Sequence, residues 1–211
     1  MIYNYNEFLN EFLNSDFNFN LLCSNGISFA RKIRYCDEHL VKIKSGSGRT
    51  VYKFDNDKVI KVAKNKAGIA QNEIENGLVN FDYDIVTKVY TYDYLGDNDD
   101  NGYIVIAEYA DKVTKNKFNE LTGIDYTIIE QFLNTYFDKN KYWQLKKEHF
   151  DELKTNEFLN ELVDLCGTFD LLFGDFDRLS TYGIVNRNGK ETVALVDYGL
   201  TNDVYKEYYR R

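Results

Sequence analysis

Residues 40–63 read Leu-Val-Lys-Ile-Lys-Ser-Gly-Ser-Gly-Arg-Thr-Val-Tyr-Lys-Phe-Asp-Asn-Asp-Lys-Val-Ile-Lys-Val-Ala. Three runs rich in β-branched and aromatic residues are separated by turn residues at 45–48 and 55–57. A period of two is typical of strands that are buried on one face, and Gly, Ser, Asn and Asp gather at turns. The stretch therefore predicts three antiparallel strands joined by short turns.

The chain beyond this stretch continues with one helix and two strands. Residues 67–80 can form a helix with its apolar side chains on one side. Strands are expected near 86–90 and at 103–107, with a polar turn between them. The predicted order is strand, strand, strand, helix, strand, strand, and two short helices within residues 5–35 precede it.

The C-terminal half is mainly helical, most clearly at residues 157–173. Apolar side chains recur there at intervals of three and four, which predicts a buried stripe of Phe158, Leu162, Leu165, Phe169 and Leu172. A hairpin is expected next, because apolar runs at 183–185 and 192–196 flank the turn residues 186–189.

Composition indicates a globular protein and argues against several kinds of partner. Hydrophobic residues make up 44% of the 211 residues, which is too apolar for a disordered segment. The net charge of −8 argues against nucleic acid as a partner. We expect no signal peptide, no membrane partner and a cytoplasmic location. The three cysteines are expected to be reduced and buried, and two histidines give little support to a zinc site.

Gly46-Ser47-Gly48 lies between two of the predicted strands. Because glycine has no Cβ, backbone N–H groups in such a turn can come close to phosphate oxygens. A plain hairpin turn is the simpler explanation of the same three residues when they are taken alone. The motif alone therefore leaves both interpretations open.

Lys61 shares its predicted strand face with Val59 and Ala63, so the face is otherwise apolar. A lysine in this position either extends to solvent or serves a buried anion, and an acidic partner would then lie nearby. The following helix offers Glu73 and Glu75. Glu75 is the better candidate, since apolar residues three and four positions further on turn its side of the helix toward the core.

The order and spacing of these motifs resemble the protein-kinase-like superfamily, in particular its compact bacterial and phage-type members. Gly46-Ser47-Gly48 resembles the glycine-rich loop, Lys61 the lysine of the third strand, and Glu75 the glutamate that pairs with it. Residues 106–110 resemble the linker between two lobes. The resemblance implies a two-lobed α+β fold with a helical extension at 1–39, an antiparallel N-lobe at 40–108 and a reduced, mostly helical C-lobe at 109–211.

The resemblance also implies how a nucleotide would bind. The phosphates of ATP would lie against the glycine-rich loop and Lys61. Val51 and Val59 would cover the adenine, and the backbone of Glu108 and Ala110 would bond to its edge.

Two further motifs resemble the catalytic parts of the superfamily. Asp197-Tyr198-Gly199 resembles Asp-Phe-Gly, whose aspartate holds magnesium between the nucleotide phosphates. Asp177 stands in the place of the aspartate that accepts a hydroxyl proton, with Asp175 as the alternative. Thr181 falls near the place of an asparagine that holds a second magnesium. The implied cofactors are ATP and Mg²⁺, with Mn²⁺ as a second option.

The sequence also departs from the family pattern. Thr181 is a weaker magnesium ligand than asparagine, and few residues follow Gly199, so the usual peptide-binding helices are not expected. We therefore expect an ATP-dependent phosphotransferase whose protein or small-molecule acceptor is unknown. One alternative is a pseudokinase-like binding module without transfer. Another is a structural part of an assembly such as a phage particle, located in a virion or a host cytoplasm.

Overall fold

The computed structural model describes residues 17–81, 83–95, 102–137 and 144–210. These residues group into two compact units. The described part of residues 1–81 forms the first unit together with Lys88–Tyr109. The second unit combines residues 83–87 with the described part of residues 110–211, so the chain enters it twice.

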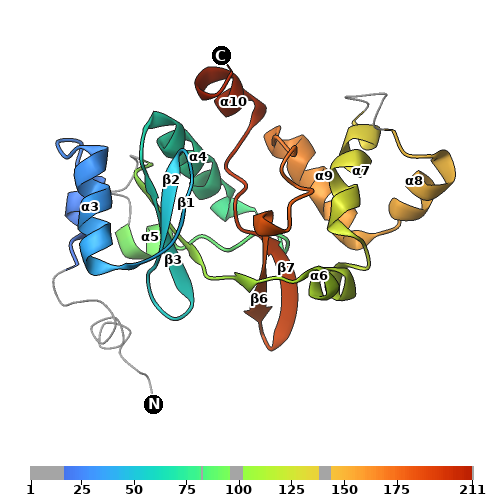
Figure 1. Cartoon of the computed structure of the whole chain (residues 1–211), viewed down its shortest axis with the longest axis horizontal. Coiled ribbons are helices and arrows are strands. Elements are labelled where there is room, and N and C mark those ends of the chain that lie inside the picture. Colours follow the sequence, from blue (N-terminus) through green and yellow to red (C-terminus); the bar gives the residue numbers. More distant parts are fainter. Residues whose placement is uncertain (1–16, 82, 96–101, 138–143, 211) are drawn as a thin grey trace. The chain divides into compact units, whose positions relative to one another are not determined.

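The first unit is built on a four-stranded antiparallel sheet in the order β1-β2-β3-β4 (Figure 1). Its strands are β1 (Val41–Ser45), β2 (Arg49–Lys53), β3 (Lys58–Ala63) and β4 (Ile104–Glu108). The three strands predicted around the Gly-Ser-Gly turn are confirmed, and β4 confirms the strand predicted at 103–107.

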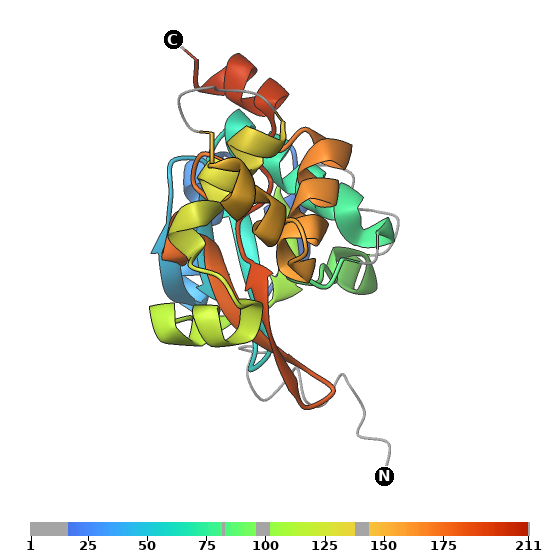
Figure 2. The same ribbon diagram turned by 90° about the vertical axis from the view of Figure 1, so that its right-hand side faces the viewer.

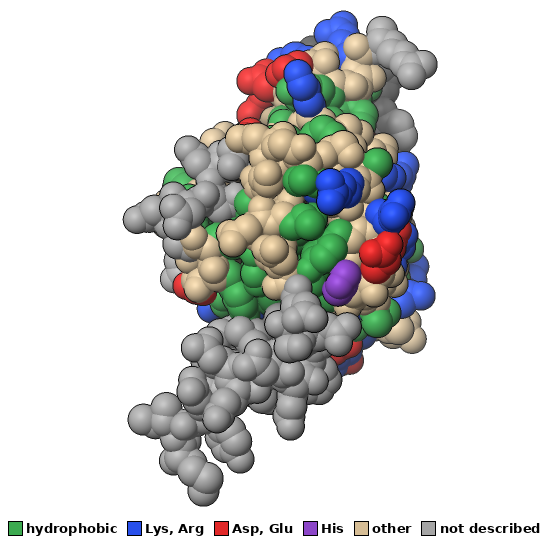
Figure 3. Space-filling model, turned by 90° about the vertical axis from the view of Figure 1, so that its left-hand side faces the viewer, with side chains coloured by type: hydrophobic (Ala, Val, Ile, Leu, Met, Phe, Trp, Pro, Cys, Tyr) green, Lys and Arg blue, Asp and Glu red, His purple; other side chains and the backbone are tan. Residues whose placement is uncertain are grey.

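One face of this sheet packs against the helices α2 (Phe19–Cys23) and α3 (Phe29–His39). Alternate residues of a strand point to the same face of the sheet. On this face, buried strand residues form one core with Leu22 of α2 and Cys36 of α3. These strand residues are Tyr52, Ile60, Val62, Ile104 and Ile106. Half-buried apolar side chains surround this core, and hydrophobic side chains gather on the face seen in Figure 3. The second of the two predicted short helices, around residues 21–33, falls on α2 and α3 and is therefore part of the unit's core, whereas the first, within residues 5–16, lies outside the described residues.

The helix α4 (Lys66–Gly77) and the short 3-10 helix η1 (Leu78–Asn80) follow β3 and confirm the helix predicted at 67–80. Lys61 of β3 points away from Ile60 and Val62 and bonds to α4. The helix therefore meets the sheet on the side that α2 and α3 leave uncovered.

The strand predicted near residues 86–90 is wrong. Val86 forms an isolated bridge with Leu195 in the second unit, whereas Val89 forms one with Ala107 in the first. The apolar residues of this stretch thus divide between two units instead of pairing along one strand. The helix α5 (Thr91–Leu95) then follows directly.

The second unit contains a three-stranded sheet and several helices. Its strands run in the order β5-β6-β7: β5 (Asp111–Lys112), β6 (Tyr182–Arg187) and β7 (Lys190–Leu195). Its helical segments are α6 (Lys115–Thr122), η3 (Tyr126–Ile128), α7 (Ile129–Tyr136), α8 (Lys147–Leu153), α9 (Glu157–Phe169), η5 (Leu179–Thr181) and α10 (Asn202–Tyr208).

The predicted hairpin is confirmed as β6 and β7, and its tip projects from the helices of its unit (Figures 1 and 2). The turn is Asn188-Gly189, with φ of 55° and 78°. Two-residue hairpin turns of the type with positive φ at both positions favour this dipeptide, because Asn and Gly adopt left-handed backbone more readily than other residues.

The buried stripe of α9 is only partly as predicted. Leu162 and Leu165 are fully buried, but Phe158, Phe169 and Leu172 are half-buried. Leu159 and Cys166 complete the buried face instead. The buried face of α9 therefore lies at a different angle around the helix axis from the predicted one. Phe158 lies at the edge of this face, where its ring contacts the rings of Phe118 and Tyr182.

The predicted α+β class, with an antiparallel sheet first and a mainly helical part after it, is confirmed. Among the described residues, no helix combines the length and apolar character that crossing a membrane requires.

The packing of α3 on the sheet predicts the reactivity of its thiol. Cys36 is 0% exposed, and burial together with the Asp37 carboxylate raises its pKa to about 12. Only the thiolate attacks a disulfide reagent, so Cys36 should stay unreactive at pH 8 in the native protein. We expect the half-buried Cys23 to react first with such a reagent, and all three cysteines to react in denaturant. Mass spectrometry of the labelled peptides would show a loosely packed α3 if Cys36 reacted as fast as Cys23.

Candidate functional site

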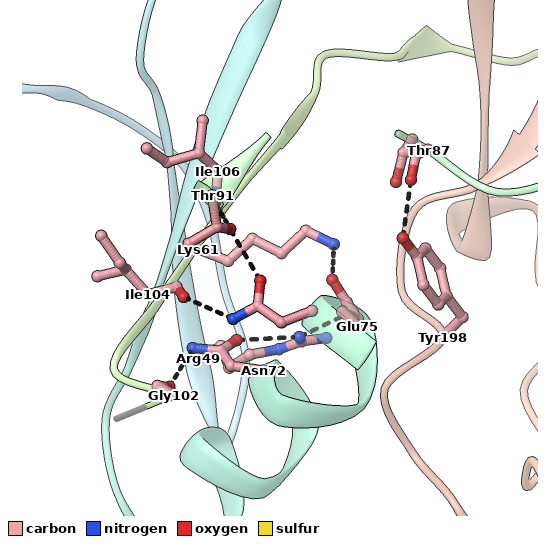
Figure 4. A network of polar contacts seen from close by, with 11 residues as sticks. Arg49, Lys61, Asn72, Glu75, Thr87, Thr91, Gly102, Ile104, Ile106 and Tyr198 are labelled. Atoms are coloured by element: carbon pink, nitrogen blue, oxygen red, sulfur yellow. Dashed lines mark hydrogen bonds and ion pairs between the residues drawn. The ribbon is translucent and has the colours of Figure 1, made fainter. Parts of the chain in front are cut away.

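Glu75 is the centre of a buried ionic cluster in the first unit (Figure 4). Its side chain is 0% exposed. Lys61 Nζ donates to Oε2, and Arg49 Nη1 lies 2.8 Å from Oε1. The predicted ion pair between Lys61 and Glu75 is confirmed, and the alternative partner Glu73 is exposed.

The register of the sheet explains why the cations converge. Val51 lies opposite Lys61 in β2, and Arg49 lies two residues away on the same face, opposite Ala63. Val59, Val105 and Ala107 make that face apolar around Lys61. Each cation is therefore withdrawn from water, and a buried charge is costly unless it is paired and hydrogen-bonded.

Asn72 connects the same cluster to the segment just before β4. It is 0% exposed, its Oδ1 accepts from Arg49 Nη1 at 3.2 Å, and its Nδ2 donates to the Gly102 carbonyl at 2.8 Å. The sequence patterns considered above did not single out Arg49 or Asn72. The available signals were the placement of Arg49 on the strand face of Lys61 and the spacing of three residues between Asn72 and Glu75 on α4.

The Gly46-Ser47-Gly48 turn is bonded to the start of α4. The Lys64 amide donates to the Gly48 carbonyl at 2.7 Å, and Asn65 Nδ2 donates to the Ser47 carbonyl at 3.0 Å. Asn65 is also the N-cap of α4, accepting from the Gly68 amide at 3.0 Å. The turn and the helix therefore approach each other closely, and a Cβ on Gly68 would lie 2.1 Å from the Gly48 oxygen.

The other predicted nucleotide contacts fall into both units. Val59 is buried in the apolar cluster, and the half-buried Val51 packs against it. The Glu108 amide donates to the Lys88 carbonyl at 2.8 Å, and Glu108 Oε2 accepts from the Lys88 amide at 3.1 Å. Ala110 begins the return of the chain to the second unit. The roles of these residues in nucleotide binding stay predictions.

In the second unit, the loop between α9 and β6 carries both candidate catalytic aspartates. Asp175 forms an exposed ion pair with Arg178, Nη1 to Oδ1 at 3.0 Å. Asp177 is half-buried, and the preceding Phe176 is 2% exposed. Tyr182 hydroxyl donates to the Phe176 carbonyl at 2.8 Å, which fixes the loop at that point. The choice of Asp177, with Asp175 as the alternative, as proton acceptor stays a prediction.

Glu130 of α7 is a third carboxylate beside this loop, and no sequence pattern pointed to it. Burial raises its pKa, and the negative charges of Asp177 and Asp175 raise it further, while Arg178 opposes them. No motif in the sequence relates residue 130 to residue 177, because only the folding of α7 brings them together.

Thr181 and Asp197, the two predicted metal ligands, differ in their exposure to solvent. Thr181 is 7% exposed, and its hydroxyl donates to the Asp175 carbonyl at 2.8 Å. Asp197 is exposed at the end of β7. The amide of Val196, just before it, donates to the Thr181 carbonyl at 2.9 Å, so the two predicted metal residues belong to neighbouring, bonded segments.

Comparison with known proteins shows a distant similarity to a solved structure. No protein-family model and no curated protein matches the chain. A solved structure of APH(2")-IIa in a ternary complex with streptomycin and ATP is similar to it, with a TM-score of 0.36 and 15% sequence identity. The match covers 76% of this chain and 65% of that one, so this chain spans about 65% of the length of the protein it matches.

The buried cluster predicts that Glu75→Gln is strongly destabilising. Neutralising the carboxylate leaves Lys61 and Arg49 buried beside an uncharged group, so we expect a loss of about 3–5 kcal/mol in the free energy of unfolding. Glu73→Gln, two residues away and exposed, should change it by less than about 0.5 kcal/mol. Urea denaturation followed by circular dichroism measures both. Equal effects would mean that Glu75 is solvated in solution.

The close approach of the glycine turn predicts opposite effects at two glycines of α4. Gly68→Ala should destabilise by about 1–3 kcal/mol, because its Cβ displaces the Gly48 carbonyl. A Cβ on Gly77 meets nothing within 4 Å, so Gly77→Ala should stabilise by about 0.5–1 kcal/mol through helix propensity. Thermal denaturation compares the two. A stabilising Gly68→Ala would show that the turn does not rest on α4.

Proposed function

We propose that this chain is an ATP-dependent phosphotransferase of protein-kinase-like fold. The main observation behind this proposal is the buried cluster of Lys61, Arg49 and Glu75, in which Arg49 directly follows the Gly-Ser-Gly turn. Two cations and one carboxylate carry a net charge of +1, which the phosphates of a nucleotide would complement. A buried cationic cluster next to a glycine-containing turn is compatible with a phosphate site.

The first unit would bind and orient the nucleotide. Lys61 would contact phosphate oxygens while Glu75 holds its ammonium in place. Arg49 would hold Glu75 from the neighbouring strand, so the carboxylate keeps its position as Lys61 engages the ligand. The apolar face with Val51 and Val59 would receive the adenine, and the backbone of Glu108 and Ala110 would bond to its edge.

The second unit would supply the base and the metal ligand. Asp177 would accept the proton of the acceptor hydroxyl as the phosphoryl group moves. Magnesium is usually held by one or two carboxylates together with phosphate oxygens and water. The exposed carboxylate of Asp197 fits that mode, although no group of three or more His, Cys, Asp or Glu among the described residues could hold a metal by itself. When bound, the metal would offset phosphate charge.

A second candidate function is nucleotide binding without transfer. Thr181 favours it, because this residue is buried and its hydroxyl is bonded to the Asp175 carbonyl. In that arrangement the second metal ligand of an active kinase has no strong replacement. A pseudokinase-like module would then keep the cluster at Glu75 for binding or stability alone.

The two candidates make different predictions for Asp177→Asn. If Asp177 is the base, turnover should fall by about 10²- to 10⁴-fold, while nucleotide affinity changes little, since the residue acts only in the transition state. Lys61→Ala should instead weaken nucleotide binding. ATP consumption and autophosphorylation, measured with Mg²⁺ and with Mn²⁺, give the rates, and titration with a fluorescent ATP analogue gives the affinity.

Asp175→Asn is the matched control, because it removes the alternative aspartate of the same loop. A large loss of turnover for Asp175→Asn alone would transfer the role of base to that residue. Nucleotide binding without turnover in the unmodified protein would favour the binding module. Absence of nucleotide binding would refute both candidates and leave the Gly-Ser-Gly segment as a hairpin turn.

A further inference from the structure

The Asp197-Tyr198-Gly199 segment is held by bonds to three separate parts of the second unit. The Val196 amide donates to the Thr181 carbonyl at 2.9 Å. The Leu172 amide donates to the Leu200 carbonyl at 2.8 Å, and Thr201 forms a bridge with Leu171. Asp197 therefore lies in a short stretch whose two ends are fixed.

Tyr198 supplies the third attachment through its side chain. The residue is 2% exposed, and its hydroxyl donates to the Thr87 carbonyl at 2.7 Å (Figure 4). A phenylalanine, the residue that the corresponding motif of the kinase family has here, would fill the same space without this bond. The hydroxyl is thus the feature that distinguishes this segment from the motif it resembles.

The segment that receives this bond is itself firmly anchored. The Thr87 amide donates to the Leu195 carbonyl at 3.0 Å, and the Leu195 amide donates to the Ile85 carbonyl at 2.7 Å. Arg187 Nη2 donates to the Val86 carbonyl at 2.6 Å. Residues 85–87 therefore line the edge of β7 like a further short strand, and Thr87 offers a fixed, 2% exposed acceptor to Tyr198.

From α9, Glu161 anchors the beginning of the same segment. Its Oε1 accepts from the amides of Asp84 at 2.6 Å and of Ile85 at 3.2 Å. A carboxylate that accepts two backbone amides holds a turn of chain more tightly than a single neutral bond does. The acceptor of the Tyr198 hydroxyl consequently has little freedom to follow that side chain if it moves.

We propose that the Tyr198 hydroxyl is a positioning group for Asp197. Its bond to Thr87 fixes the backbone directly after Asp197, as the bond from Val196 to Thr181 fixes the backbone directly before it. The backbone that carries the Asp197 carboxylate is thereby fixed on both sides, which would keep this carboxylate in place for a divalent cation. This inference rests on the proposed function, because it takes Asp197 to be the metal ligand.

Removing only the Tyr198 hydroxyl should weaken metal binding and leave the packing of the ring unchanged. Tyr198→Phe leaves the ring packed but takes away the donor of a buried carbonyl, so residues 196–201 gain freedom. Metal affinity should fall by about three- to tenfold, the factor that one net hydrogen bond supports.

The experiment titrates Mn²⁺ against binding of a fluorescent ATP analogue and measures backbone hydrogen exchange in the protein free of metal and nucleotide. Tyr52→Phe is the matched control. It removes a hydroxyl from a tyrosine that is 0% exposed and bonds to Asp37 at 2.8 Å, on the sheet face opposite Lys61. We expect Tyr198→Phe to raise the half-saturating Mn²⁺ concentration and the exchange of residues 196–201, and Tyr52→Phe to change neither.

The outcomes separate the two levels of the proposal. If the unmodified protein binds the nucleotide in a metal-dependent way and Tyr198→Phe shifts neither Mn²⁺ dependence nor exchange, the positioning role is refuted and the proposed function stands. Equal shifts for both variants would also refute it, because they would reflect general loosening. If the unmodified protein binds no nucleotide with Mn²⁺, the proposed function fails and this inference falls with it.

Discussion

The first unit depends on the neutralisation of one buried carboxylate. Glu75 is completely enclosed, so its charge is tolerable only while Lys61 on β3 and Arg49 on β2 stay beside it. Gly68, Asn72 and Glu75 are spaced by four and three residues, which places them on one side of α4. This side meets the sheet through a close glycine contact, an amide and a carboxylate, where most helices use apolar side chains. Electrostatic pairing therefore sets the register between helix and sheet.

Local sequence patterns predicted the elements whose causes are local. Alternation located β1 to β4, and Asn188-Gly189 located the hairpin because few other dipeptides accept positive φ twice. The pair of Lys61 and Glu75 was predictable for a similar reason: a lysine on an apolar strand face requires an acid, and the next helix offers two. The choice between Glu73 and Glu75 followed from helical periodicity alone.

The features that were not predictable depend on contacts between distant residues. Residues 86–90 resemble a strand in composition, yet their two bridges run to partners in different units. Glu130 comes near Asp177 only through the packing of α7. Arg49 was on the correct strand face, but neither its own spacing nor its charge indicated that Glu75 would bind two cations. On α9, the aromatic ring of Phe158 sits at the edge of the core, a geometry that spacing does not encode.

The discontinuous second unit has a consequence for how the chain is made. Residues 83–87 leave the ribosome soon after β3 and α4, yet the Tyr198 hydroxyl that bonds to Thr87 is synthesised 111 residues later. During translation the N-terminal unit can complete its sheet before the residues that bind segment 83–87 have been synthesised. A fragment cut at Tyr109 would likewise leave the β7 edge, Glu161 and Arg187 without the backbone they bind. Separating the units therefore requires a rearranged chain in which residues 83–87 are joined to the C-terminal piece.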